Sequence, residues 1–195
     1  MTRTAQVDRS TAETTVEVTL DLDGTGEADI TTGVGFFDHL LTSLAVHSLF
    51  DLTVRAEGDL HVDDHHTVED TALVVGTALT RALGDRTGIT RFGDSRVPMD
   101  EALAQAAVDI SGRPFAMINL ELRTPLIGAM TTQNLPHAFE AFTRTGGLTL
   151  HLTAVGRNDH HVAEAAIKAL ARALRAAVTI DPRRGNAVPS SKGTL

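Results

Sequence analysis

Two segments of the sequence begin with the same pattern: 65–84 reads HHTVEDTALVVGTALTRALG, and 160–178 reads HHVAEAAIKALARALRAAV. Both continue with apolar residues at helical spacing, at Leu73, Ala78, Leu79 and Leu83 and at Ile167, Leu170, Leu174 and Val178. Their starts lie about half the 195-residue chain apart, as an internal repeat requires. We therefore predict two related helices, each with two histidines and one glutamate in its first turn.

The elements that precede these two helices also match. A strand-like run comes directly before each helix, from Phe50 and from Leu148. Before each run lies a helix candidate with a single repeat-related histidine, His39 or His137, and strand-like runs come first. The order β-β-β-α-β-α is thus expected twice. This order predicts an α+β fold of two similar half-domains, each a mixed sheet of about four strands covered by two helices.

The predicted boundary between the half-domains lies in a loop rich in Gly, Asp and Arg. We assign 1–88 to the first half-domain, 89–187 to the second, and 188–195 to a C-terminal tail. The tail, VPSSKGTL, is polar and has no periodic pattern. Its composition alone predicts a loose terminus.

Composition excludes several classes of protein. The 17 Lys and Arg face 25 Asp and Glu, a net charge of −8 that disfavours nucleic-acid binding. The nine histidines come with no cysteine, so thiolate zinc sites and disulfides are excluded. No apolar run reaches the roughly 20 residues that span a bilayer, and MTRTAQVDRS lacks the apolar core of a signal peptide. We expect a soluble, cytoplasmic protein without membrane or nucleic-acid partners.

The repeated pattern has the geometry of a metal site. Residues i and i+4 share a helix face, so His65 and Glu69 point the same way, as do His160 and Glu164. One such pattern alone is more typical of a solvated helix start. Two copies, each with an upstream histidine, favour metal binding. We predict two sites: His65 and Glu69 with His161, and His160 and Glu164 with His66, with His39 and His137 each completing one set.

The ligand types narrow the choice of metal. Imidazole and carboxylate ligands without sulfur suit Mn, Fe, Ni, Zn or Co, and more than four ligands disfavour tetrahedral zinc. We expect Mn or Fe. His47, His61 and His151 have no repeat partner and are assigned structural roles, although His47, two turns beyond His39, could line the same site.

A second pattern suggests a different activity. The run VEVTLDLDGT, residues 16–25, resembles the first motif of haloacid-dehalogenase-type phosphatases, with Asp21 as nucleophile and Asp23 as general acid. The alternative is a turn in which Gly24 and Gly26 supply positive φ angles. That phosphatase family needs a helix directly after this strand, whereas another strand-like run follows here. We therefore expect the turn.

Seven segments together resemble the imidazoleglycerol-phosphate dehydratase family of histidine biosynthesis. They are TTGVGFFDHLL (31–41), HHTVEDTA (65–72), RFGDS (91–95), PMDEALAQAAVDISGRP (98–114), HAFEAF (137–142), NDHHVAEAAIKALARALR (158–175) and PSSKGTL (189–195). The resemblance implies a lyase that converts imidazole glycerol phosphate to imidazole acetol phosphate and water. It also implies two Mn²⁺ per active site, which hold the ring as an imidazolate that expels the hydroxyl group.

The resemblance implies roles for individual residues. One Mn²⁺ is expected on His39, His66, His160 and Glu164, and the other on His65, Glu69, His137 and His161. Proton transfer is expected from Glu13 and Glu164, with the choice of base left open, and Lys168 could contact the hydroxyl. The expected phosphate ligands are Arg91, Arg113, Ser190, Ser191 and Lys192. The expected contacts to the rest of the substrate are Glu13, His39, His47, His65, Glu69, His160 and Lys168.

Family membership would also imply a homo-oligomer, a cage of 24 subunits built from trimers, with sites at subunit interfaces. Two departures from the family pattern stand out: Ser43 replaces a glutamine found in many relatives, and the segment between Leu122 and His137 is short. Two alternatives stay open on sequence alone. One is the phosphatase, and the other is a non-catalytic protein whose subunits are joined by metal.

Overall fold

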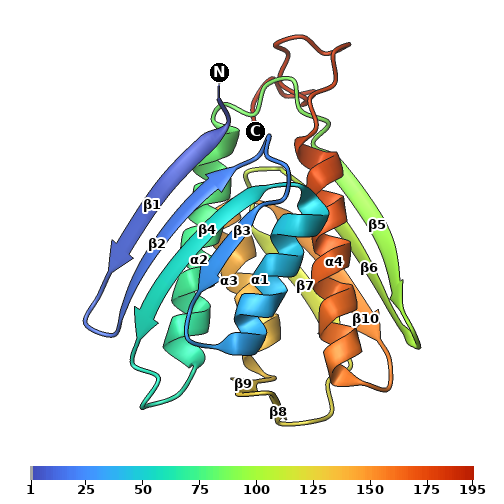
Figure 1. Ribbon diagram of the computed structural model, residues 1–195. Coiled ribbons are helices and arrows are strands. Elements are labelled where there is room, and N and C mark those ends of the chain that lie inside the picture. The colour runs from blue at the N-terminus through green and yellow to red at the C-terminus, as the bar shows by residue number, and fades with distance from the viewer. Residues whose placement is uncertain (1) are drawn as a thin grey trace.

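Two four-stranded sheets enclose a layer of four helices in the computed structural model, which describes residues 2–195 (Figure 1). The first half of the chain forms β1 (Thr4–Ser10), β2 (Thr14–Asp21), β3 (Ala28–Thr31), α1 (Gly35–Ser48), β4 (Asp51–Gly58) and α2 (His65–Leu83). The second half forms β5 (Phe92–Met99), β6 (Ala102–Asp109), β7 (Phe115–Leu120), β8 (Leu126–Ile127), β9 (Met130–Thr131), α3 (Asn134–Gly146), β10 (Thr149–Val155) and α4 (Asp159–Val178).

Both sheets have the same topology. Their strand orders are β1-β2-β4-β3 and β5-β6-β10-β7. In each sheet one pair, β3 with β4 or β7 with β10, is parallel, and the other pairs are antiparallel. The predicted α+β class with mixed four-stranded sheets is confirmed. The short hairpin β8–β9, which has no counterpart in the first half of the element order, was not predicted, and the half-domain boundary after residue 88 stays a prediction.

The helices lie between the sheets in matched pairs. Helices α1 and α2 pack on the first sheet and α3 and α4 on the second, while α2 contacts α3 and α1 contacts α4 across the middle. The strands alternate between buried and exposed residues, so that Val16, Val18 and Leu20 of β2 point inward. This arrangement brings the helices that carry His39 and His137 against the helices that carry the repeated pattern.

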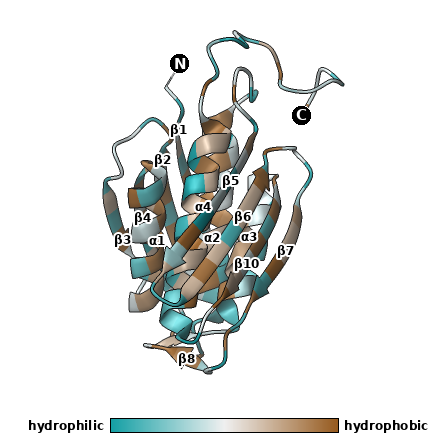
Figure 2. Ribbon diagram, turned by 90° about the vertical axis from the view of Figure 1, so that its right-hand side faces the viewer, coloured by the Kyte–Doolittle hydropathy of each residue, from teal (hydrophilic) through white to brown (hydrophobic). Residues whose placement is uncertain are grey.

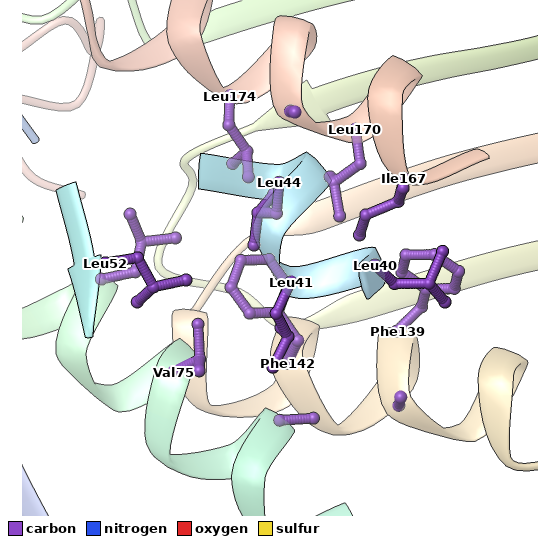
Figure 3. Close-up of a cluster of buried hydrophobic side chains, with 14 of the residues drawn as sticks. Leu40, Leu41, Leu44, Leu52, Val75, Phe139, Phe142, Ile167, Leu170 and Leu174 are labelled. Atoms are coloured by element: carbon purple, nitrogen blue, oxygen red, sulfur yellow. The ribbon is translucent and has the colours of Figure 1, made fainter. Parts of the chain in front are cut away.

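Apolar side chains from all four helices meet in the middle of the layer. Figure 3 shows Leu40 and Leu44 of α1, Phe142 of α3, and Ile167 and Leu170 of α4 gathered there. They line a cavity of about 30 Å³. An apolar cavity of this kind excludes water. The helices are therefore held together by packing, and the polar chemistry lies at their ends.

The outer faces of the two sheets differ in character. Figure 2 looks onto the second sheet, whose exposed face includes Leu103, Phe115, Met117 and Val155. The corresponding positions of the first sheet are mostly charged or hydroxylic, as at Glu17. No helix within residues 2–195 is both long and apolar enough to cross a membrane.

The segment after β2 is a turn, as expected. Asp21 Oδ1 accepts a hydrogen bond from the Asp23 backbone N–H at 2.8 Å, and the Asp23 carboxylate pairs with Arg3. Strand β2 is antiparallel to both of its neighbours, which is incompatible with the parallel sheet of the phosphatase family. One detail was wrong: Gly26 has φ +93°, but Gly24 has no positive φ and is needed because a Cβ there would overlap Asp51.

Helices α2 and α3 lie close together at Gly76. A Cβ on Gly76 would overlap Thr145 Oγ1 and the Phe142 carbonyl oxygen, both on α3. We predict that Gly76→Ala lowers the free energy of unfolding by about 1–3 kcal/mol through overpacking. This is opposite in sign to the gain of about 1 kcal/mol that Gly→Ala gives inside an exposed helix. Urea denaturation measures the effect.

The matched control is Gly35→Ala at the start of α1, where no described atom lies within 4 Å of an added Cβ. This variant should be neutral or slightly stabilised. Equal stability changes in the two variants would contradict the close helix packing at Gly76.

Candidate metal centre

The start of α4 forms the first cluster of metal-type ligands. Asn158 is the N-cap, and its side-chain oxygen accepts a hydrogen bond from the His160 backbone N–H at 3.0 Å. The helix then places His160 and Glu164 on one face, and α1 brings in His39. Nε2 of His39 and Nε2 of His160 lie 2.9 and 2.8 Å from the same oxygen, Glu164 Oε1. We call these three residues the α4 cluster.

The start of α2 forms a second cluster with the same composition. His65 Nε2 lies 3.6 Å from Glu69 Oε2, and His137 Nε2 of α3 lies 3.4 Å from Glu69 Oε1. The other ring nitrogen of His65 is 3.0 Å from the side-chain oxygen of Asn134, the first residue of α3. We call His65, Glu69 and His137 the α2 cluster. In each cluster, one potential ligand atom per residue lies within 4.8 Å of the others.

Both clusters place a sheltered carboxylate behind accessible imidazoles. The Glu164 side chain is 8% exposed, whereas the side chains of His39 and His160 are 47% and 45% exposed. In the α2 cluster the Glu69 side chain is likewise less exposed than those of His65 and His137. Each cluster is therefore open on its histidine side, where further ligands could approach.

A cation also pairs with each carboxylate. Lys168, one turn after Glu164 on α4, pairs with Glu164 Oε2, and Arg144 Nη2 lies 2.9 Å from Glu69 Oε1. Burial alone would raise the pKa of Glu164, but hydrogen bonds from Lys168, His39 and His160 outweigh it and lower the pKa to about 2. Burial alone would likewise raise the pKa of Glu69, but Arg144 and His137 outweigh it, so the pKa is lowered. Both carboxylates are held in the ionised form that a metal requires.

One atom indicates that the α2 cluster fits a cation. Nε2 of His137 is buried and has no hydrogen-bond partner within residues 2–195, although it faces Glu69. A buried polar atom without a partner is costly, and a metal ion would satisfy it. Imidazole and carboxylate are also a suitable donor set for Mn²⁺ or Fe²⁺. The residues of both clusters therefore fit a divalent metal.

His66 and His161 lie outside both clusters of their own chain. The ring planes of His65 and His66 are inclined at 80°, and those of His160 and His161 at 82°. His66 Nδ1 is 3.0 Å from Asp59 Oδ2, and His161 Nδ1 is 2.8 Å from Glu101 Oε2. These hydrogen bonds raise the pKa of each histidine, since a carboxylate favours the charged ring. The predicted inclusion of His66 and His161 in metal sites is not met within a single chain and stays a prediction.

Glu13, a candidate for proton transfer, is close to His66 in its own chain. It ends the β1–β2 turn, and its Oε1 lies 3.8 Å from His66 Nε2. Glu101 occupies the same place in the β5–β6 turn, directly before β6, as Glu13 does directly before β2. Sequence reasoning missed Glu101. Aligning AETT with DEAL ahead of the two strands would have found it.

The other residues missed by sequence reasoning are the hydrogen-bond partners of the clusters. Asp59, Asn134 and Arg144 come from a strand end, a helix start and the last turn of a helix. None of them belongs to the repeated pattern, so only the packing of the elements places them beside the histidines.

Among the remaining histidines, His47 lies in the last turn of α1. Burial, followed by the charges of Lys168 and Arg172, lowers the pKa of His47, so this ring faces α4 beyond the α4 cluster. His151 is an exposed residue of β10 whose ring lies 6.0 Å from that of Phe115, and His61 is in the loop before α2. His151 and His61 take no part in either cluster.

The predicted phosphate ligands form a separate group around Asp109. Nε and Nη2 of Arg91 donate to the two oxygens of Asp109 at 2.6 and 3.0 Å, and Arg91 Nη1 donates to the Pro189 carbonyl at 2.8 Å. Arg113 is 68% exposed, and its Nη2 lies 3.9 Å from Asp109. The tail thus packs through a buried Pro189, so the loose terminus expected from composition alone was wrong.

The polar residues of the tail follow directly after this contact. Ser190 is half-buried, Ser191 and Lys192 are exposed, and the Lys192 backbone N–H donates to Ser190 Oγ at 3.2 Å. We call Arg91, Arg113, Ser190, Ser191 and Lys192 the tail group. This group lies at the end of α4 that is far from Glu164, because the Arg91 backbone N–H donates to the Ala177 carbonyl. At a rise of 1.5 Å per residue, Glu164 is about 20 Å away from that end.

Comparison with known proteins identifies the family of this chain. The sequence profile of imidazoleglycerol-phosphate dehydratase matches residues 32–174. The imidazoleglycerol-phosphate dehydratase of Acidiphilium cryptum is 58% identical over all of both chains, and that of Cereibacter sphaeroides is 57% identical over 99% of this chain and all of the relative.

Solved structures agree with the sequence relatives. The Staphylococcus aureus enzyme matches with a TM-score of 0.83 and 36% identity, over 91% of this chain and 99% of that chain. The Pyrococcus furiosus enzyme matches with a TM-score of 0.82 and 32% identity, over 97% of this chain and 100% of that chain.

The fold and the matches define an enzyme of the hydro-lyase class, which removes water from its substrate. The chain belongs to the imidazoleglycerol-phosphate dehydratase family, which acts in histidine biosynthesis. The resemblance stated from sequence is confirmed at this level.

The low pKa of Glu164 predicts how acid affects stability. Its pKa is about 2 in the folded protein against an ordinary 4.5, so its stabilising contribution is complete above pH 4.5 and is lost as pH falls toward 2. In metal-free protein, Glu164→Gln removes this contribution. The melting temperature of the variant should therefore fall less steeply than that of the wild type across this window, as measured by circular dichroism.

The control is Glu17→Gln, which removes the same charge from the exposed face of β2. It should keep the wild-type slope. If Glu164→Gln also keeps that slope, the hydrogen-bonded carboxylate of the α4 cluster contributes nothing, contrary to the structure.

Proposed function

We propose that this chain dehydrates imidazole glycerol phosphate to imidazole acetol phosphate and water, and that two Mn²⁺ ions serve each active site. The observation that carries the proposal is the pair of clusters, each a sheltered glutamate with two accessible histidines on packed helices. Family membership supports the substrate, a phosphorylated imidazole. The unpaired Nε2 of His137 supports the metal.

The proposed metal sites are completed by a second copy of the chain. Each cluster supplies three ligands, fewer than the six of an octahedral Mn²⁺ site. His66 and His161 are turned away from the clusters of their own chain. We assign His66 of one copy to the α4 cluster of another, and His161 to the α2 cluster of another. Each ion then has four protein ligands and open positions for substrate.

The reaction removes the hydroxyl group from the carbon beside the ring and a proton from the next carbon, which no carbonyl acidifies. Mn²⁺ held by the two clusters would stabilise negative charge on the ring and so assist departure of the hydroxyl group. Within this chain, Glu164 and Glu13 are the carboxylates proposed to move protons. Glu164 is held by Lys168, which places an ammonium group one helix turn along, where it can donate to the departing hydroxyl.

The phosphate group is proposed to bind Arg113, Lys192, Ser190 and Ser191, with Arg91 holding the tail in place. Arg113 and Lys192 are exposed and offer positive charge. Arg91 already donates hydrogen bonds to Asp109 and to the Pro189 carbonyl. We therefore assign it two roles, which are to hold the tail in place and to add positive charge. The substrate, a ring and three carbons, is too short to reach from this group to the α4 cluster of the same chain. The tail group and the cluster must therefore come from different copies.

These arguments support a homo-oligomer with active sites between subunits. The proposed assembly is a cage of 24 subunits built from trimers, located in the cytoplasm. Membership of a hydro-lyase family disfavours the alternative of a non-catalytic protein whose subunits are joined by metal. A dehydratase assay in the presence of Mn²⁺, together with metal analysis and light scattering, tests activity, cofactor and assembly at once.

Subunit sharing predicts that two inactive variants can restore each other. His66→Ala keeps its α4 cluster but cannot donate the fourth ligand, and Glu164→Gln loses its cluster but still donates His66. Each variant alone should have reduced metal content and little dehydratase activity. Co-expressed with different tags and purified as mixed assemblies, they should regain a measurable fraction of wild-type activity.

The control pairs His39→Ala with Glu164→Gln, because both changes damage the same cluster of one chain and no rescue is expected. Equal activity in the two mixtures would show that the site is not shared as proposed. Wild-type activity and full metal content in Glu164→Gln alone would refute the role of Glu164.

Asp21→Asn should leave activity almost unchanged, since Asp21 only forms a turn.

Histidine ligation also predicts a dependence on acid. Imidazole binds metal only when it is neutral, so protons compete with Mn²⁺ as the pH falls below the ordinary histidine pKa of about 6.5. Metal content, assembly mass and activity should decline together over that range, as followed by light scattering and metal analysis. An assembly that keeps its metal and its mass well below this pH would contradict subunit contacts held by histidine.

A further inference from the structure

We propose that Asp59 and Glu101 are positioning residues that fix the rings of His66 and His161, so that Nε2 of each ring is presented as a ligand to another copy of the chain. The inference rests on the proposed function, because it assumes that metal is shared between subunits. It assigns a role to two carboxylates that belong to neither cluster.

Asp59 holds His66 from the end of β4. Its two carboxylate oxygens lie 3.2 and 3.0 Å from His66 Nδ1. The backbone of Asp59 is fixed on both sides: its N–H donates to the Glu13 carbonyl at 3.1 Å, and its carbonyl accepts from the Val62 N–H at 2.7 Å. The Asp59 carboxylate is therefore fixed by the loop that precedes α2, the helix of His66. The His66 ring cannot turn without losing its hydrogen bond to Asp59.

Glu101 holds His161 from the β5–β6 turn. Its Oε2 lies 2.8 Å from His161 Nδ1, while its Oε1 accepts from the backbone N–H groups of Arg157 and Asn158 at 3.1 and 2.8 Å. One carboxylate thus fixes both the loop that starts α4 and the ring of its second histidine. A strand end and a hairpin turn, which are unrelated elements, provide the same contact in the two halves of the chain.

The contact determines which ring nitrogen can bind metal. A neutral histidine that donates its Nδ1 proton to a carboxylate keeps a free lone pair on Nε2. His39, His160, His65 and His137 also turn Nε2 toward the glutamate of their cluster. All six proposed histidine ligands would therefore use the same nitrogen. Carboxylates of this kind orient metal-bound histidines in other proteins.

Glu13 does not take the place of Asp59, although it occupies the turn position that corresponds to Glu101. Its carboxylate lies 3.8 Å from Nε2 of His66, beyond hydrogen-bond distance, and on the other side of the ring from Asp59. Glu13 therefore remains free for the substrate, while Asp59 fixes the ring. This division of roles explains why the first half of the chain needs Asp59 in addition to Glu13.

The test compares Asp59→Ala, Asp59→Asn and Glu57→Gln in the full-length chain. Mn²⁺ is titrated into metal-free protein by calorimetry, and light scattering follows the assembly mass at each Mn²⁺ concentration. Asp59→Ala should weaken Mn²⁺ binding by about 10- to 100-fold and shift assembly to a correspondingly higher Mn²⁺ concentration. Asp59→Asn should recover part of this loss, because its amide oxygen can still accept the Nδ1 proton.

Glu57→Gln removes one negative charge from an exposed site two residues earlier, on β4, and should bind Mn²⁺ as the wild type does. If Asp59→Ala binds and assembles like the wild type, the inference is wrong and the proposed function still stands. If the wild type itself takes up no Mn²⁺, the proposed function is wrong, and the inference that rests on it is wrong too. Glu101→Gln should weaken binding in the same direction as Asp59→Asn.

A second measurement needs no variant. In metal-free wild-type protein at alkaline pH, nitrogen-15 NMR of the histidine rings reports which nitrogen carries the proton. His66 and His161 should carry it on Nδ1. A proton on Nε2 in these two rings would overturn the inference, whatever the variants show.

Discussion

The site depends on one packing constraint: each helix that starts with the repeated histidine pattern is packed against the helix that carries His39 or His137. Helix α4 packs on α1 and α2 on α3, inside a layer closed by two sheets. The i, i+4 spacing within a helix can align only one imidazole with one carboxylate. The second imidazole of each cluster comes from the neighbouring helix. Any change in helix packing would therefore separate His39 from Glu164, or His137 from Glu69.

The same packing leaves both clusters incomplete. The helix ends emerge from the layer with their histidines partly exposed, and the more buried side of each cluster is occupied by its glutamate. Ligands can approach only from outside, and the chain presents His66 and His161 outward on carboxylates of their own. A subunit with open clusters and outward ligands is suited to assembly through metal. The tail group at the opposite end of α4 extends this argument to the phosphate.

Much of the fold could be predicted from sequence because its apolar residues recur with a strong period. The helical spacing after His65 and His160, and the alternation in runs such as 14–21, indicate the elements and their order. The hairpin β8–β9 was missed because its two-residue strands have no measurable alternation. The tail was misjudged from composition because its position depends on a long-range hydrogen bond between Arg91 and Pro189. Asn134 and Arg144 escaped because they lie outside the repeated pattern and reach His65 and Glu69 only through helix packing. Asp59 and Glu101 escaped because they contact His66 and His161 from connections whose path the helical period does not predict.

The sequence by itself determined the α+β order of elements, the pairing of histidine with glutamate on two helix starts and, through the family resemblance, the class of reaction. These follow from local periodicity and from motifs, which are read along the chain. Only the tertiary structure decided which histidine joins which cluster, that His66 and His161 turn away, and that the residues proposed to bind phosphate lie about 20 Å along α4 from Glu164. The physical reason is that these relations are set by packing between elements distant in sequence, where burial and hydrogen bonds choose the neighbours.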